Sequence, residues 1–122
     1  MGTSTDTPKK DVIDKEWLER MASTRKDFVK RMFSVFIAEE PKRLEKVKTA
    51  LEINDFAELK FLAHSIKGAA STLGAEPTRA AAAALEIAAR DENSAESQNC
   101  YSLLDENLTS LVNFMQNFID KE

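Results

Sequence analysis

The chain has 122 residues, enough for one domain, and 43% of them are hydrophobic, which suffices to build a core. Its 21 acidic and 17 basic side chains give a formal charge of −4, which argues against a nucleic-acid-binding protein because such proteins need a basic surface. Cys100 is the one cysteine and His64 the one histidine, so an intramolecular disulfide and a metal site built from several cysteines or histidines are excluded.

Targeting signals are missing from the sequence. No apolar run approaches the roughly 20 residues that span a bilayer, and the polar start of the chain has no apolar signal core. We therefore expect a cytoplasmic protein without a membrane partner, and the polar residues after Met1 favour a stand-alone protein. Turn-forming residues are scarce, with three glycines and three prolines, which predicts an all-α fold.

The N-terminal region divides into a tail and a short helix. Residues 1–11 are polar and are expected to form a disordered tail, so the folded domain is predicted to cover residues 12–122. Apolar side chains at Ile13, Trp17 and Met21 then lie on one side of a short helix.

A long helix is predicted next, with an apolar face from Val29 to Leu51. Thr24, with Asp27 three residues later, has the spacing of a capping box at its start. Pro41 either kinks one long helix or separates two. The apolar face resumes nearly in phase after this proline, which favours one kinked helix.

The following two helices have clear start and stop signals. Asp55, with Glu58 three residues later, again predicts a capping box, and Gly74 is placed to end this helix in a left-handed conformation. Pro77 fits the first turn of the next helix, which is predicted to end near residues 91–94.

The C-terminal segment has the clearest helical pattern, with apolar residues every three or four positions from Leu104 to Ile119. Short connections between long amphipathic helices make sequential helices antiparallel. The sequence therefore predicts an all-α fold, an antiparallel up-down four-helix bundle with a short additional N-terminal helix.

His64 lies on the helix that begins after Asp55, one step around from its apolar face. Residues three, four and seven positions away share its side of the helix: Ala57, Lys60, Phe61, Lys67, Gly68 and Ser71. We therefore expect the imidazole to face solvent, where one ring nitrogen is available as a nucleophile.

Three neighbours distinguish this histidine from an ordinary surface residue. Lys67 brings a cation one turn away, and Gly68 stands mid-helix, where glycine costs about 1 kcal/mol relative to alanine. The missing side chain would let another molecule approach the backbone closely, although it could also ease packing between helices. Phe61 is either a contact for a partner protein or the rim of the core. Together these features suggest that His64 carries a negatively charged group, and a phosphoryl group fits.

Residues 63–75, AHSIKGAASTLGA, closely resemble the signature of histidine-containing phosphotransfer (HPt) domains of bacterial multistep phosphorelays. The family pattern is a histidine, two residues, Lys-Gly and a later Gly-Ala pair, and it is matched by His64, Lys67, Gly68, Gly74 and Ala75. Leu85 and Glu86 also look like part of the family's following helix. The resemblance extends over roughly residues 28–119.

This resemblance implies a role for each residue of the motif. His64 would accept a phosphoryl group, expected at Nε2, from an aspartate of a receiver domain and pass it to another receiver. Lys67 would assist by its charge, and Gly74 would be structural. The remaining residues of the His64 face would form the receiver docking surface, with Ser71 the weakest candidate: Lys60, Phe61, Gly68 and Ser71.

The resemblance also implies the partners. They would be receiver domains of response regulators or of a hybrid histidine kinase, and we expect this chain to be a monomer. No cofactor is expected, since magnesium would belong to the receiver rather than to this chain. Such domains are phosphorelay intermediates without kinase activity of their own.

Two other functions compete with this interpretation. A histidine autokinase typically has an acidic residue directly after its histidine, whereas Ser65 follows here, and three glycines leave no Gly-rich ATP-binding loop. Autophosphorylation is therefore not expected. The second is a non-catalytic helical adaptor that uses Phe61, His64 and Gly68 only for binding.

Overall fold

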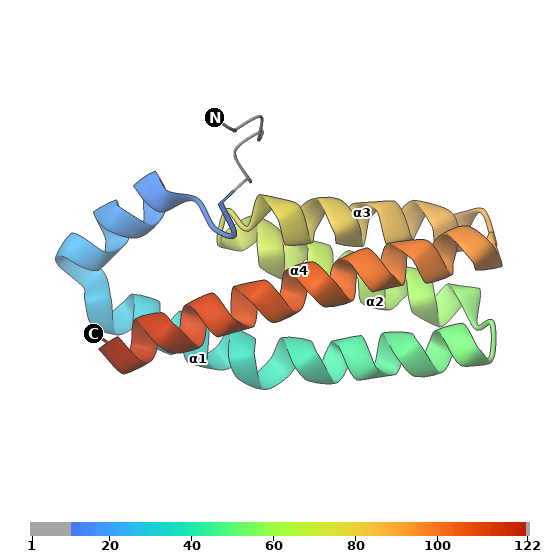
Figure 1. Cartoon of the computed structure of the whole chain (residues 1–122), viewed down its shortest axis with the longest axis horizontal. Coiled ribbons are helices and arrows are strands. Elements are labelled where there is room, and N and C mark those ends of the chain that lie inside the picture. The colour runs from blue at the N-terminus through green and yellow to red at the C-terminus, as the bar shows by residue number, and fades with distance from the viewer. Residues whose placement is uncertain (1–10, 122) are drawn as a thin grey trace, which may run out of the picture.

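The computed structural model describes residues 11–121, and they form an antiparallel bundle of four α-helices (Figure 1). The helices are α1 (Lys15–Glu52), α2 (Phe56–Thr72), α3 (Glu76–Arg90) and α4 (Ser94–Lys121). Each packs against the next along the chain and α4 packs against α1, so α2 and α4 lie on a diagonal of the bundle. The described residues contain no strand, so the predicted all-α bundle is confirmed. Residues 1–10 of the predicted tail lie outside the described part of the chain.

The predicted short N-terminal helix is joined to the long helix within α1. The break between the two parts is at Arg25, whose φ of −138° and ψ of 46° leave the helical range. The predicted capping box at Thr24 and Asp27 is wrong. Because the backbone is still helical at Thr24, its hydroxyl donates to the carbonyl oxygen of Arg20 four residues earlier, at 3.4 Å.

After this break α1 continues to Glu52 without another non-helical residue, and it runs through Pro41. The prediction of one helix around this proline, rather than two, is therefore confirmed. The N-terminal part of α1 folds back from the break toward the turn between α2 and α3 (Figure 1). A Cβ atom at Gly74 would lie 2.7 Å from the Cβ of Asp14, so the two segments are in close contact there.

All three connections have the same backbone geometry. Each helix is followed by a residue of left-handed φ, which is 55° at Asn54, 65° at Gly74 and 52° at Glu92. The next amide donates to the carbonyl five residues earlier, at 2.9, 2.9 and 3.0 Å: Asp55 to Ala50, Ala75 to Ala70, and Asn93 to Ala88. This is the Schellman arrangement, which satisfies carbonyl groups at a helix end. The predicted left-handed Gly74 is thereby confirmed.

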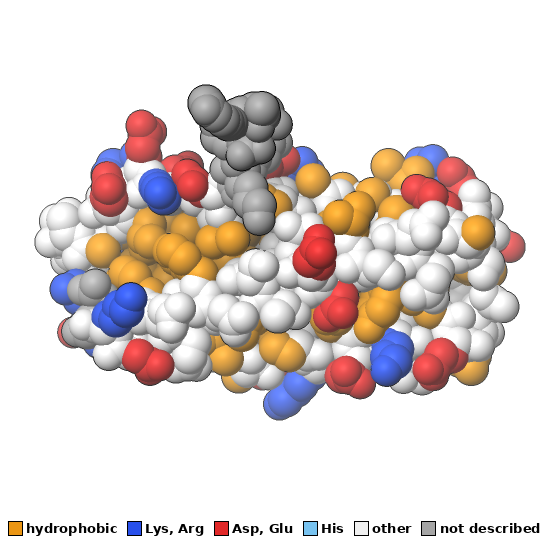
Figure 2. Space-filling model, in the orientation of Figure 1, with side chains coloured by type: hydrophobic (Ala, Val, Ile, Leu, Met, Phe, Trp, Pro, Cys, Tyr) orange, Lys and Arg blue, Asp and Glu red, His pale blue; other side chains and the backbone are white. Residues whose placement is uncertain are grey.

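The core runs along the bundle axis and is aliphatic and aromatic. Its largest residues with under 2% exposure are Phe33, Ile13, Leu59, Ile66, Leu85, Leu104, Leu108, Leu111, Met115, Val29 and Val47. Phe33 meets Phe118 edge to face at a centroid distance of 5.3 Å, which ties α1 to α4. On the face that Figure 2 shows, further apolar side chains gather between α4 and the N-terminal part of α1. None of the helices in residues 11–121 is both long and apolar enough to cross a membrane.

Candidate functional site

The helix α2 holds His64 on the outside of the bundle. The Asp55 carboxylate accepts the Glu58 amide at 3.1 Å and so starts the helix. Ala63 and Ile66 have no exposed surface, and they fix one side of α2 against the core. The imidazole on the other side is 66% exposed, which confirms the exposure predicted from the helical pattern.

The other residues predicted to share this side of α2 are also at the surface. Five of them are exposed and one is partly exposed: Ala57, Lys60, Phe61, Gly68 and Ser71, and then Lys67. Phe61 is 64% exposed, so it is a surface residue and not the rim of the core. The hydrogen bonds found in residues 11–121 do not join the Ser71 hydroxyl to either His64 or Lys67.

Gly68 is surrounded by open space. A Cβ atom built at this position would have no atom of another element within 4 Å. Close packing between helices therefore does not require a glycine here. The exposed bare backbone one turn after His64 agrees with the predicted approach of another molecule.

A carboxylate from α3 joins this site. Glu86 Oε2 lies 3.0 Å from His64 Nδ1, and Glu86 Oε1 lies 2.7 Å from Lys67 Nζ. One carboxylate thus bridges the imidazole and the ammonium group, which stand one turn apart on α2. Its own side chain is 23% exposed, so the three groups are partly shielded from water on the α3 side.

These contacts fix which ring nitrogen of His64 is available. The hydrogen bond from Lys67 is the main cause that lowers the pKa of Glu86 below its usual value, and the contact with His64 adds to it. Glu86 is therefore ionised at neutral pH and can only accept hydrogen bonds. Nδ1 must then donate its proton to Glu86, which leaves the lone pair of the neutral ring on Nε2. No hydrogen-bond partner for Nε2 is found among residues 11–121.

Sequence reasoning did not assign Glu86 to the site. A usable signal exists, because Ala75 lies in the connection and both His64 and Glu86 are eleven positions from it. In an antiparallel helical hairpin, residues equally distant from the turn lie side by side. Lys67 and Ala83 are paired in the same way, eight positions from Ala75.

A shallow hollow of about 300 Å³ lies between α2 and α3 beside this carboxylate. Its lining contains three cationic side chains, one carboxylate and two apolar residues: Lys60, Lys67, Arg90, Glu86, Ala83 and Ile87. The α3 side of His64 is therefore mainly cationic, which suits a phosphoryl group or an acidic partner.

The acidic side chains near His64 are not arranged as metal ligands. Within the described part of the chain, no group of three or more His, Cys, Asp or Glu side chains is placed to hold a metal ion. The carboxylate nearest His64 is instead occupied by the ring and by Lys67.

Comparison with known proteins agrees with this geometry. The Hpt domain family model matches residues 31–114, which include α2 and α3 entirely. The histidine-containing phosphotransfer protein B (HptB) of Pseudomonas aeruginosa PAO1 has the same fold, with a TM-score of 0.83 at 20% identity over 91% of this chain and 96% of that chain. A candidate histidine-containing phosphotransfer protein from rice aligns with a TM-score of 0.79 at 16% identity over 89% of this chain and 80% of that chain. No curated protein matches the sequence at a significant level.

The family match covers more than half of the chain, and the solved structures share the whole bundle. Hpt proteins are phosphotransfer intermediates, not kinases, and they work in phosphorelays with receiver domains. The sequence match and the shared four-helix bundle show that this chain belongs to the Hpt domain family and serves histidine phosphotransfer in a phosphorelay.

Proposed function

We propose that Nε2 of His64 accepts the phosphoryl group from a phosphoaspartate of one receiver domain and gives it to an aspartate of another. The observation that carries this proposal is the exposed imidazole whose Nδ1 is held by Glu86 while Nε2 has no partner among the described residues. A nitrogen with a free lone pair at the surface of a rigid helix can meet an aspartyl phosphate held by another protein.

The transfer step follows from this arrangement. The Nε2 lone pair attacks phosphorus, a nitrogen–phosphorus bond forms, and the bond from phosphorus to the aspartate oxygen breaks. The aspartate leaves as a carboxylate, and the ring becomes a phosphoimidazolium that keeps its proton on Nδ1. The Glu86 carboxylate, 3.0 Å from Nδ1, stabilises the positive charge that develops on the ring. Transfer to the second receiver reverses each of these changes.

Lys67 would act on the phosphoryl group through its charge. Its side chain is 30% exposed and lies on the same side of α2 as the imidazole, so its ammonium group can turn toward the equatorial oxygens of the transferring group. Its ion pair with Glu86 holds it beside the ring before the partner arrives. Gly68, Phe61, Lys60 and Ser71 would form the surrounding contact surface, on which Gly68 lets the receiver approach the backbone.

The remaining needs of the reaction would be met by the receiver. Magnesium would be held there, close to its own aspartate, and this chain would act as a monomer without a cofactor. Two receiver domains could then visit the same imidazole in turn, because one exposed site serves both directions of transfer.

The test is transfer from phosphorylated receiver domains of the source organism to the purified full chain. A label that is stable in alkali, labile in acid and located on His64 supports the proposal. A chain that binds a phosphorylated receiver but never takes up label would instead be a non-catalytic adaptor that uses the same face.

A further inference from the structure

The segment before the break in α1, residues 11–24, is a separate packing element that we call the N-terminal arm. One non-helical residue, Arg25, joins it to the rest of α1. Figure 1 shows the arm folding back from this break toward the turn between α2 and α3. The Hpt family model begins its match at residue 31, so the arm lies outside the matched segment. Its role must therefore be read from its own contacts.

The break has no capping interaction of its own. The hydroxyls of Ser23 and Thr24 both donate to the carbonyl oxygen of Arg20, at 2.9 and 3.4 Å, so they serve the helix before the break. In the described part of the chain, no hydrogen bond to the Asp27 side chain caps the helix that follows. Residues 15–40 contain neither glycine nor proline, so the local sequence also suits a continuous helix. The bend is therefore held by packing rather than by a cap.

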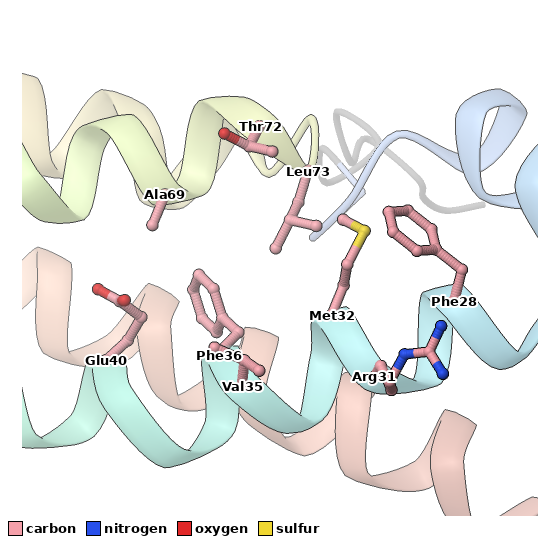
Figure 3. Close-up of a pocket in the computed structure, with 9 residues that line it drawn as sticks. All are labelled: Phe28, Arg31, Met32, Val35, Phe36, Glu40, Ala69, Thr72 and Leu73. Carbon is pink, nitrogen blue, oxygen red and sulfur yellow. The ribbon is translucent and has the colours of Figure 1, made fainter.

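A small set of contacts supplies this packing. Ile13 is 1% exposed and Leu18 is 9% exposed, and both belong to the core of the bundle. At the break, the guanidinium carbon of Arg25 lies 4.4 Å from the centroid of the Phe28 ring. Figure 3 shows this ring beside Met32, on the first turns of α1 after the break. Releasing the arm would uncover the bundle surface that Ile13 and Leu18 now occupy.

A straight α1 would carry the arm away from its own bundle. Helical φ and ψ at Arg25 would extend the helix through Lys15–Thr24, by about 15 Å. Ile13 and Leu18 would then lie in water, beyond the end of the bundle, which is unfavourable for apolar side chains. The surface that fits the arm is the one it has left, and a second copy of the chain presents the same surface. Two straight chains can therefore cover each other by exchanging arms.

We propose that the N-terminal arm is exchangeable, and that two copies of this chain form a dimer in which each straightened α1 places its arm on the other copy's bundle. The dimer has the same arm contacts as the monomer and differs at Arg25, so the two are states of one chain whose balance depends on concentration. The bundles would lie end to end, because each α1 leaves the partner's bundle at the end where the arm now bends.

The exchange would leave both histidines open. His64 is ten residues from Asn54 in the α1–α2 connection, so it lies level with Leu44 on α1. Arg25 is nineteen residues from Leu44, which is about 28 Å along the helix. A standard interface of about 800 Å² on each partner has a radius of about 16 Å, so a receiver centred on His64 does not reach the break. Under the proposed function, on which this consequence rests, the dimer would hold two receivers at once.

The variants Arg25→Ala and Arg25→Gly test the exchange in the full chain. Both lose the contact with Phe28, and they differ because alanine favours a helix and glycine disfavours one. Each dimer contains two straightened breaks, so the dimer Kd should be about 25-fold lower for Arg25→Ala than for Arg25→Gly. Ser34→Ala and Ser34→Gly are the matched control pair. Ser34 is exposed and helical in both states, so their Kd values should agree within about twofold.

The measurement must let the arms detach. Chains at a series of concentrations up to the millimolar range are incubated in urea near the unfolding midpoint and returned to buffer. Size-exclusion chromatography with light scattering then gives the dimer Kd, and small-angle X-ray scattering should show a dimer nearly twice as long as the monomer. Labelling of His64 by phosphoramidate, a small donor that needs no docking surface, should be equal per chain in both states.

Ile13→Asp separates arm exchange from association through another surface. The charged side chain weakens the hold of the arm on either bundle, so the exchanged dimer should be lost while helicity and phosphoramidate labelling remain. If this variant does not fold, the two Arg25 variants decide alone.

Three results would overturn the proposal: no dimer of Arg25→Ala, equal dimer Kd values for the two Arg25 variants, or a dimer that survives Ile13→Asp. The proposed function fails in a different measurement, when no phosphorylated receiver labels His64 in the unmodified chain. That failure would leave the dimer Kd values and the exchange itself unchanged.

Discussion

His64 separates two surfaces of opposite character. Toward α1 the surface is apolar and hollow, with Val35 62% exposed and no side chain filling the space above Gly68. Toward α3 it is charged and paired, with Glu86 bound to both the imidazole and Lys67. Apolar contacts contribute mainly to affinity, whereas fixed charges beside a reacting group act on the transition state. The comparison teaches that one helix can present apolar surface on one side of its histidine and paired charges on the other.

The two sides of α2 also hold carboxylates whose pKa values are shifted in opposite directions. Burial raises the pKa of Glu40, although Arg43 opposes this by its charge. One oxygen of this carboxylate is buried without a hydrogen-bond partner. The hydrogen bond from Lys67 lowers the pKa of Glu86. The α3 side thus favours an ionised carboxylate, and the α1 side disfavours one.

The largest effect is expected from His64→Gln, which removes the imidazole that lies between the two surfaces. Transfer from a phosphorylated receiver should fall below detection, a loss of more than about 1,000-fold, because no other nucleophile replaces the ring. The free energy of unfolding should change by less than about 0.5 kcal/mol, since the side chain is exposed. Radiolabel transfer and urea unfolding measure the two effects. A label that persists in this variant would place the nucleophile elsewhere.

Lys67→Ala sharpens the comparison on the charged side. The rate of transfer should fall about tenfold, because the cation beside the transferring group is lost, while the Kd for the receiver stays within about twofold. Rapid-quench kinetics with a phosphorylated receiver measure the rate. Lys60→Ala is the matched control, a lysine of the same hollow that forms no ion pair with Glu86. Equal rates for the wild type and Lys67→Ala would remove the lysine from the reaction.

Gly68→Gln tests whether the receiver approaches the exposed backbone of α2. A side chain in the open space above the helix should raise the Kd for the receiver about tenfold by obstructing close approach. Labelling by phosphoramidate should stay near the wild-type rate, and helicity should be retained because glutamine favours helices more than glycine does. An affinity equal to that of the wild type would show that the receiver does not approach this backbone.

The smallest effects concern the two carboxylates and the pH dependence of stability. A lowered pKa means that Glu86 stabilises the fold above its ordinary value of 4.5, and this contribution is lost as the pH falls through the lowered value. The pKa of Glu40 is raised instead, so its carboxyl group stabilises the fold below its ordinary value of 4.5. This contribution is lost as the pH rises through the raised value.

From pH 3 to pH 7, the free energy of unfolding of Glu86→Gln should therefore fall relative to the wild type, while that of Glu40→Gln should rise relative to it. Each change should be on the order of 1 kcal/mol or less. Urea unfolding at the two pH values measures both. Shifts of the same sign in the two variants would contradict the assignment of opposite environments.

Most of the fold could be predicted from local signals. Asp55, Gly74 and Pro77 specify helix ends through hydrogen bonds and backbone conformations within a few residues, so a single sequence is sufficient. The break between the short N-terminal helix and the long helix was predicted to within one residue, because the structure has it at Arg25. The capping box that was expected to mark it does not form, and the Thr24 hydroxyl donates to the carbonyl oxygen of Arg20 instead.

The same distinction holds for the candidate site, where local signals were sufficient for some residues and not for others. His64, Lys67 and Gly68 share one helix, and helical periodicity alone predicted their common exposed face. Glu86 was missed because it lies on α3, and its approach depends on the register between two helices. The apolar hollow between α1 and α2, lined among others by Val35 and Thr72, was missed for the same reason, since its two walls come from different helices.

The most direct test is long-range proton–nitrogen NMR of the His64 ring, before and after phosphorylation by a receiver. At neutral pH the unphosphorylated ring should carry its proton on Nδ1, and Glu86→Ala should weaken this preference. After transfer, phosphorus should couple to Nε2, with the proton still on Nδ1. Phosphorus on Nδ1, or a ring that stays unmodified while another residue takes the label, would contradict the central claim.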